Sequence, residues 1–334
     1  MIFVETAYTI VVPDQNLLAQ LCGTNDSNLH LIEKHLGVSV FTQGNELSLG
    51  RLPSGRISPD TDDSQVVQQF QHIVDRMMDE AAAGFDVGPD LMASILQLRQ
   101  DGHRCEDFRD CGIIIPGAVR KVYPKTGNQL RLVRAMRSCD MVFCTGPAGS
   151  GKTFLMMAEA LRLVLSGTVR TLIITRPVVE AGESLGYLPG DLEQKINPYL
   201  RPLFDVMNSL LPLGSGKKLM EGGVVEVAPL AYMRGRTLSN SVILLDEAQN
   251  TTREQMKMFL TRMGEGSKVF VTGDITQIDL PRRTPSGLVH CLRILRDIPE
   301  IGMMAMDSGD VVRNELVKKI VQAYEDSKSE EELE

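Results

Sequence analysis

The sequence predicts an α/β protein built on one parallel sheet and preceded by a smaller α+β domain. Three observations support this fold class. After residue 113, short apolar segments alternate with helical segments, a pattern typical of buried parallel strands. One of these apolar segments runs directly into a glycine-rich loop and a helix. The first 85 residues instead carry short alternating segments around a hairpin signal. We therefore expect domains at 1–85 and 113–326, a linker at 86–112 and an acidic, disordered tail at 327–334.

The elements of the first domain follow from local patterns. The dipeptide Gly44-Asn45 separates two β-rich runs and predicts a tight hairpin turn. Apolar residues recur with helical spacing between 66 and 83, and the Pro-, Ser- and Gly-rich stretch 52–63 predicts a loop. Expected strands lie at 6–12, 38–43 and 46–49, and expected helices at 15–22, 29–35 and 66–83.

The second domain is predicted from its strands. A short helix at 91–98 falls in the linker before it. Its expected strands lie at 141–145, 172–175, 224–227, 241–246, 268–272 and 302–305, with helical segments between them.

Composition restricts the class of protein. The chain has 334 residues, a net charge of −8 and no Trp, which argues against a globally basic nucleic-acid binder but leaves room for a local basic patch. Six cysteines form no C-x-x-C pair, so a reducing cytoplasm is the expected location. His103, Cys105 and Cys111 match no standard zinc spacing. The first residues lack the basic start of a signal peptide, and no apolar run is long enough for a membrane span.

The glycine-rich loop predicts a phosphate site. Gly146, Pro147, Ala148, Gly149, Ser150, Gly151, Lys152 and Thr153 match the G-x-x-x-x-G-K-[ST] pattern. The pattern lies between an apolar strand and a helix, which is the context that phosphate binding requires. We expect Lys152 to reach the β and γ phosphates of ATP, and the Thr153 hydroxyl to ligate Mg²⁺.

A second pattern predicts the rest of the reaction centre. The apolar strand Ser241–Leu245 ends in Asp246 and Glu247, and adjacent carboxylates at a strand end are costly without a partner. We expect Asp246 to hold Mg²⁺ and Glu247 to act as general base toward water. The alternative is that both acids are solvated at the start of the next helix, where Thr252 and Gln255 form a capping box. After the strand that follows, Gln277 is placed to contact the γ-phosphate.

These motifs resemble the PhoH-like family of phosphate-starvation-inducible ATPases, which are related to superfamily 1 helicases. The resemblance covers most of the chain, and its most specific parts are GPAGSGKT, TRPVVEAGESLGYLPGDLEQKINPYLRPLFD, DEAQN and TGDITQIDLP. It implies a single RecA-like P-loop domain. It also implies a KH-like N-terminal domain through HLGVSVFTQGNELSLG, although the GXXG signature is not evident in residues 1–85.

The same resemblance implies roles for three more residues. Gln129 looks like a Q-motif glutamine that reads adenine; an amide that caps a loop is the alternative. Arg176 and Arg313 look like helicase-type arginines near the phosphates, with ordinary surface residues as the alternative.

The sequence and the family resemblance favour an ATPase motor or remodeller acting on RNA, with a ribonuclease as a candidate partner. A small-molecule kinase and an ATP-dependent scaffold with little turnover are the alternatives. Because only one RecA-like domain fits after residue 113, we expect a homo-oligomeric ring, a hexamer being one option, in which Arg313 acts across the interface. Candidate RNA contacts are Lys217, Lys218, Arg234 and Arg236, in two basic, glycine-containing loops.

Overall fold

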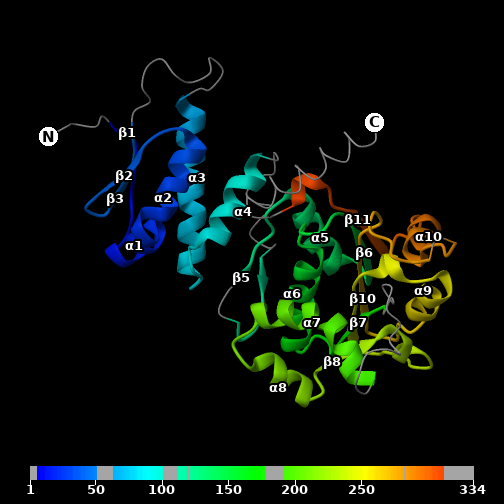
Figure 1. The fold of residues 1–334 in the computed structure, drawn as a ribbon. Helices are drawn as coiled ribbons and strands as arrows, with labels where there is room; N and C mark the ends of the chain where they lie inside the picture. The colour runs from blue at the N-terminus through cyan, green and yellow to red at the C-terminus, as the bar shows by residue number, and fades with distance from the viewer. Residues whose placement is uncertain are drawn as a thin grey trace, which may run out of the picture. The chain divides into compact units, whose positions relative to one another are not determined.

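The computed structural model describes residues 6–50, 63–100, 112–118, 121–177, 192–281 and 283–311 (Figure 1). By internal contacts the chain forms two compact units, one of Met1–Ile114 with Arg120–Gly127 and one of Ile115–Val119 with Asn128–Glu334. Most of the stretch 113–127 thus groups with the first unit, whereas the sequence prediction assigned it to the second domain. None of the helices in these described ranges has the length and apolar character needed to cross a membrane.

The first unit is a small α+β fold, as predicted. Its three antiparallel strands have the order β1-β3-β2, and β2 and β3 are joined through the expected turn, in which Gly44 has φ +64°. The elements are β1 (Thr6–Val11), α1 (Gln15–Cys22), α2 (Ser27–Leu36), β2 (Val40–Gln43), β3 (Glu46–Gly50), α3 (Asp63–Ala82), α4 (Pro89–Gln100), β4 (Ile113–Ile114) and β5 (Lys121–Val122).

Helix α3 supplies much of this unit's core. Phe70, Ile73, Val74 and Met77 are fully buried, and their spacing places them on one helix face. Tyr123, which follows β5, packs into the same cluster. The residues directly after β5 are therefore held to the first unit by apolar contacts.

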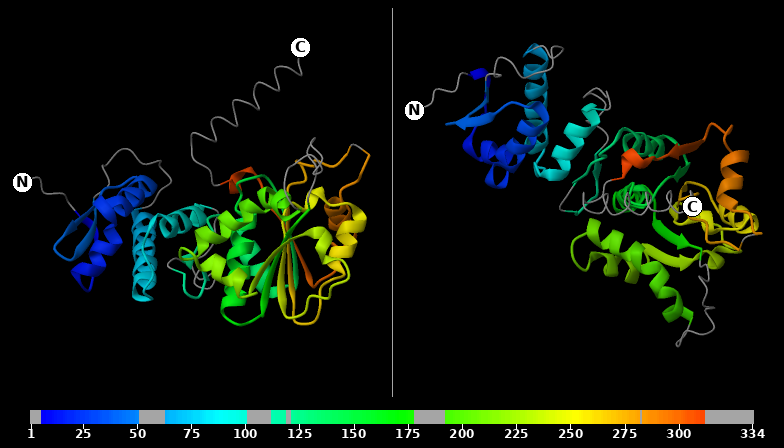
Figure 2. Two further views of the ribbon diagram at one scale, coloured as in Figure 1. Left: turned by 60° about the horizontal axis from the view of Figure 1, so that its bottom comes forward. Right: turned by 45° about the horizontal axis from the view of Figure 1, so that its top comes forward.

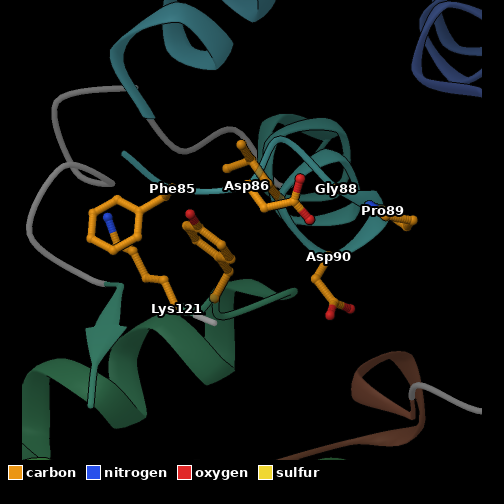
Figure 3. A pocket seen from close by; sticks show the side chains of 8 residues that line it. Phe85, Asp86, Gly88, Pro89, Asp90 and Lys121 are labelled. Carbon is orange, nitrogen blue, oxygen red and sulfur yellow. The ribbon is translucent and has the colours of Figure 1, made fainter. Parts of the chain in front are cut away.

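A buried ionic network fastens β5 to α3. The Glu80 carboxylate lies 2.6 Å from Arg76 and 2.9 Å from the Lys121 ammonium, and it accepts a 3.0 Å hydrogen bond from Tyr123. Burial, then the charge of Glu80, raises the pKa of Tyr123, so its hydroxyl remains a donor. Beside this network is a cavity of about 230 Å³, where the Lys121 ammonium lies 4.9 Å from the centre of the Phe85 ring (Figure 3).

The second unit contains a six-stranded sheet with the order β11-β6-β10-β9-β7-β8, all of whose neighbouring strands are parallel. All six predicted strands are present. The elements are α5 (Gly127–Ser138), β6 (Met141–Thr145), α6 (Lys152–Leu165), β7 (Thr171–Arg176), α7 (Leu192–Leu210), α8 (Ser215–Glu221), β8 (Val225–Pro229), β9 (Ser241–Leu245), α9 (Arg253–Leu260), β10 (Lys268–Gly273), α10 (Gly287–Ile294) and β11 (Ile301–Ala305).

Helices cover both faces of this sheet (Figure 2). On one face, Met256 and Phe259 of α9 and Leu288 of α10 form a buried cluster with alternate strand residues such as Phe143 and Val271. Helix α6 packs against β9, β7 and β10. Because β10 lies between β6 and β9, it separates the strand that precedes the glycine-rich loop from the strand that ends at Asp246.

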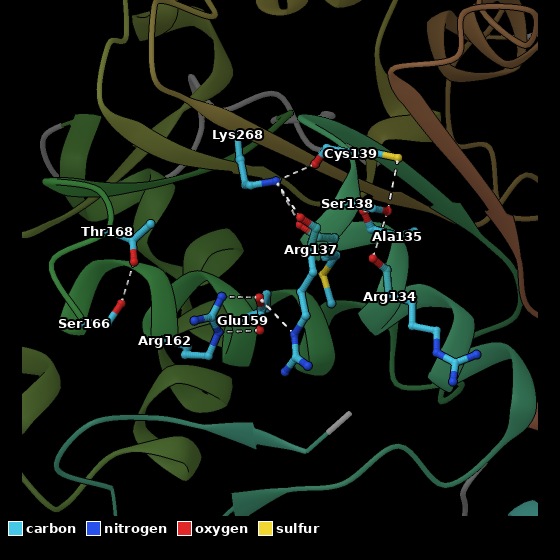
Figure 4. Close-up of polar contacts among 11 residues, drawn as sticks. Arg134, Ala135, Arg137, Ser138, Cys139, Glu159, Arg162, Ser166, Thr168 and Lys268 are labelled. Carbon is cyan, nitrogen blue, oxygen red and sulfur yellow. Dashed lines mark hydrogen bonds and ion pairs between the residues drawn. The ribbon is translucent and has the colours of Figure 1, made fainter. Parts of the chain in front are cut away.

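Polar contacts link α5, α6 and β10 near the end of the sheet at which the strands begin (Figure 4). Glu159 on α6 is fully buried, and both of its oxygens accept hydrogen bonds from Arg162, at 2.9 and 2.7 Å; Arg137 of α5 lies 3.7 Å away. The Lys268 ammonium donates to backbone carbonyls at the end of α5, including Cys139 at 2.6 Å. A cation at this point suits the helix dipole.

Candidate functional site

The glycine-rich loop adopts a backbone conformation that requires glycine at three positions. Gly146, Gly149 and Gly151 have φ values of +143°, +84° and +83°, which residues with a Cβ rarely adopt. At Gly146 space is also limiting, because a Cβ there would lie 2.5 Å from the carbonyl oxygen of Met306. The loop then leads into α6, which begins at Lys152.

Lys152 is buried within this loop. Its ammonium donates to the carbonyl oxygens of Gly146 and Pro147, both at 2.7 Å, and to the Ser150 hydroxyl at 3.2 Å. Burial lowers the pKa of Lys152, while nearby acidic groups, among them Asp274 and Asp246, act in the opposite direction. The side chain is therefore a desolvated cation at the start of a helix, where a phosphate would be stabilised most.

Asp246 accepts two hydrogen bonds on one oxygen. Thr153 from α6 donates to Oδ1 at 2.8 Å, and Thr272 from β10 donates to the same atom at 2.6 Å. The strand order explains this meeting, since β10 stands next to β9 and its last residues reach the same sheet edge. The structure thus brings together Thr153 and Asp246, the two residues that the sequence predicted as Mg²⁺ ligands.

Glu247 has a strained backbone and a restrained side chain. Its φ of +53° and ψ of +39° lie in the left-handed region, which is unfavourable for a residue with a Cβ. One carboxylate oxygen, Oε1, lies 3.2 Å from Arg176, and the other, Oε2, accepts a 2.5 Å hydrogen bond from Gln249. The side chain therefore has a defined position at the end of β9.

The loop after β10 is attached to the same region through Gln249. This side chain is 1% exposed; its oxygen accepts from the Asp274 amide at 3.0 Å, and its nitrogen donates to the Gln277 carbonyl at 3.1 Å. Next to it, Asn250 and Asp279 exchange two hydrogen bonds, at 2.8 and 3.2 Å. The position of the Gln277 loop is thereby tied to that of Glu247.

One cavity, of about 290 Å³, joins these parts. It is lined by Ala148, Gly149, Gly151, Lys152, Thr153, Phe154, Val206, Asp246, Glu247, Thr272, Gly273, Asp274 and Gln277. Residues predicted from three separate motifs therefore face one space. Arg176 contacts this site through its ion pair with Glu247.

Gln129 lies next to the phosphate loop. It is 3% exposed, and its side-chain nitrogen donates to the Ser150 carbonyl at 3.1 Å. This contact matches the loop-capping alternative; its reading of adenine stays a prediction. Asn128 donates to Asp310 at 2.8 Å. Arg313, His103, Cys105, Cys111 and the acidic tail lie outside the described residues.

The donor set suits Mg²⁺ bound together with a phosphate. Thr153 and Asp246 offer hard oxygen ligands, which this ion prefers. Within the described ranges, no three acidic, imidazole or thiol groups converge to hold an ion on their own. An ion at this site would therefore need phosphate oxygens and water to complete its coordination.

The structure adds three residues that sequence reasoning missed: Thr272, Gln249 and Asp274. Gln249 lies inside DEAQN, and Thr272 and Asp274 lie inside TGDITQIDLP, so their membership of these motifs was an available signal. Asp274 is 6% exposed; Thr276 donates twice to its Oδ1, and its Oδ2 is buried without a hydrogen-bond partner.

The prediction that these basic residues lie in two loops is wrong for Lys217 and Lys218, which stand on helix α8, whereas Arg234 and Arg236 follow the short helical turn Leu230–Met233. Arg236 forms a bidentate ion pair with Glu226, at 2.5 and 2.7 Å. Lys217 is 78% exposed and lies 3.6 Å from Glu221, in a pair that solvent screens. Arg234 is exposed. Lys217, Lys218 and Arg234, which are all exposed, are thus better placed than Arg236 for contacts with an external phosphate.

Known proteins show which family the chain resembles. The family model described as PhoH-like protein matches residues 121–325, a range that contains the glycine-rich loop, Asp246, Glu247 and Gln277. A PhoH-like protein of Bacillus subtilis is 43% identical over 319 residues, covering 94% of this chain and 95% of the relative. A PhoH-like protein of Synechocystis is 40% identical over 328 residues, covering 97% and 96%. Protein PhoH of Escherichia coli is 46% identical over 198 residues, covering 59% and 56%. Because the family model covers residues 121–325, and the Bacillus subtilis and Synechocystis relatives match over 94% and 97% of the chain, the chain belongs to the PhoH-like protein family.

Proposed function

We propose that the chain binds ATP together with Mg²⁺ and hydrolyses it, and that hydrolysis is coupled to the binding or remodelling of RNA in the cytoplasm. The observation that carries the ATPase proposal is the single cavity shared by Lys152, the Thr153–Asp246 pair and Glu247. These are the cation, the metal-binding oxygens and the base that phosphoryl transfer to water requires.

Each residue has a defined task in this reaction. Lys152 and the loop amides hold the β and γ phosphates, and the Thr153 hydroxyl and the Asp246 carboxylate would hold Mg²⁺. When bound there, the ion would neutralise charge on the phosphate oxygens. Glu247 accepts a proton from the attacking water as the water oxygen bonds to the γ-phosphorus, and the bond between that phosphorus and the bridging oxygen breaks to release ADP and phosphate. Gln277, on the loop tied to Glu247, contacts the γ-phosphate.

Coupling to RNA is supported by the family resemblance and by three exposed cations, Lys217 and Lys218 on α8 and Arg234. On this proposal the protein works as a ring of identical subunits, with Arg313 acting on the neighbour's ATP and a ribonuclease as a candidate partner. The ring is motivated by the one P-loop sheet in the described part of the chain, since a neighbouring subunit could supply the other wall of the ATP site.

The test is ATP hydrolysis measured with and without single-stranded RNA, with Glu247→Gln as the matched control. We expect Mg²⁺-dependent turnover that RNA increases, and almost none in the control. Turnover that RNA leaves unchanged would remove the RNA coupling, and phosphate transfer to a small molecule in preference to water would favour the kinase alternative.

A further inference from the structure

We propose that Arg176 restrains Glu247. Its ion pair holds the general base in a resting position, and ATP turnover requires this ion pair to break. This inference rests on the proposed ATPase function and adds a form of regulation to the same site. It also reverses the role that resemblance to helicases implies for Arg176, which is stabilisation of charge on the phosphates.

The geometry of the carboxylate is the first argument. Oε1 of Glu247 lies 3.2 Å from the Arg176 guanidinium, and Oε2 accepts a 2.5 Å hydrogen bond from Gln249. A general base has to present a carboxylate oxygen to the attacking water. In this arrangement both oxygens of Glu247 are engaged by protein donors, so the side chain has to leave at least one of these contacts before it can face a water at the γ-phosphate.

The two restraining residues are not equivalent. Gln249 is 1% exposed, and besides its hydrogen bond with Glu247 its side chain accepts from the Asp274 amide and donates to the Gln277 carbonyl. Its position is set by the fold. The Arg176 side chain is longer and 22% exposed, so of the two it has the freedom to leave.

A second contact connects Arg176 to another element. Its guanidinium donates to the Tyr199 carbonyl of α7 at 3.2 Å and lies 4.0 Å from Asp246. Helix α7 packs on β7, β8 and α6, so Arg176 stands between this helix and the two acids of the site. A movement of α7 toward or away from β7 would therefore change the hold on Glu247, which gives a bound partner a means of controlling turnover.

The direction in which one substitution changes the basal kcat distinguishes the two possible roles of Arg176. If Arg176 restrains Glu247, Arg176→Ala raises the basal kcat for ATP in the absence of RNA. We expect an increase of about three- to fivefold, which is the effect of losing a partly exposed ion pair. The KM for ATP should change little, and RNA should stimulate the variant less than it stimulates the wild type. If Arg176 stabilises the transferred phosphoryl group, the same change lowers kcat.

Three variants make this test specific. Arg296→Ala removes a surface arginine that is ion-paired with Asp297, and it should leave basal turnover unchanged. Arg176→Lys keeps one positive charge and should fall between the wild type and Arg176→Ala. The double variant Arg176→Ala with Glu247→Gln should be inactive, because the added turnover has to pass through Glu247. Thermal denaturation establishes that each variant is folded.

The outcomes are distinct. A raised basal kcat that disappears in the double variant supports the restraint. An unchanged or lowered kcat in folded Arg176→Ala overturns it, as does a raised kcat that survives in the double variant. If the wild type binds ATP by titration calorimetry but neither it nor Arg176→Ala hydrolyses ATP, the proposed function fails together with this inference. If the wild type hydrolyses ATP and Arg176→Ala is slower, this inference alone fails.

Discussion

Thr272 offers a direct test of how the metal-binding carboxylate is held. Its hydroxyl donates to Oδ1 of Asp246 at 2.6 Å, and both residues are buried, at 1% and 6% exposure. Thr272→Val preserves the shape of the side chain and replaces only this donor with a methyl group. The variant leaves Asp246 with Thr153 as its remaining hydroxyl partner on that oxygen.

The size of the effect follows from the chemistry of this bond. A hydrogen bond to a charged group contributes about 1.5–3 kcal/mol. At about 1.4 kcal/mol per decade this corresponds to a change of roughly tenfold to a hundredfold. Loss of a group that orients a metal ligand falls in the same range. We therefore expect the Mg²⁺ concentration that gives half-maximal ATPase activity to rise at least about tenfold, with a smaller change in kcat at saturating Mg²⁺.

The assay is a Mg²⁺ titration of ATPase activity, with circular dichroism to establish folding. Thr272→Ser is the matched control, because it retains the hydroxyl and should stay close to the wild type. A folded Thr272→Val protein with an unaltered Mg²⁺ requirement would refute the reasoning that Thr272 orients Asp246 for the metal.

Four further predictions address other parts of the molecule. Lys152→Ala removes the cation of the phosphate loop and should abolish measurable binding of MgATP by titration calorimetry; wild-type affinity would disprove the assignment of this loop. Glu247→Gln should bind ATP normally and lose turnover by about 10²- to 10⁴-fold, the usual contribution of a general base, so hydrolysis at the wild-type rate would place the base elsewhere. Glu80→Gln removes the negative charge from a buried site that contains Arg76 and Lys121, and it should cost the first unit about 3–5 kcal/mol in denaturant unfolding; Asp90→Asn, which removes the more exposed ion pair with Lys125, should cost less than about 1 kcal/mol, and similar losses in both would contradict the burial argument. Arg313→Ala chains should bind ATP but hydrolyse it slowly, and mixing them with Glu247→Gln chains should restore part of the activity; no recovery in demonstrably mixed assemblies would exclude action between subunits.

Much of the candidate site was predictable because each of its motifs is a short continuous segment. The loop from Gly146 to Thr153 depends on backbone conformations that three glycines allow and on the helix that follows, all within a few residues. Asp246 and Glu247 were recognisable because they end an apolar strand, and strand and helix periodicity is also local. The parallel sheet followed from the same alternation, and the structure contains all six expected strands.

The sequence alone determined that a glycine-rich loop, an acidic strand end and a polar third loop exist in this chain. Only the tertiary structure decided which side chains of these segments contact one another. Strand order places β10 between β6 and β9, and that order brings the Thr272 hydroxyl onto Asp246. The contacts of Arg176 with Glu247 and of Gln129 with Ser150 likewise join segments that are distant along the chain. The ion pair of Arg236 with Glu226 was not predictable from the sequence either, because a local basic pattern does not show which acidic residue lies next to it in the fold. Local patterns encode backbone conformation, whereas hydrogen bonds and ion pairs between distant segments depend on how the whole unit packs, which no local period reports.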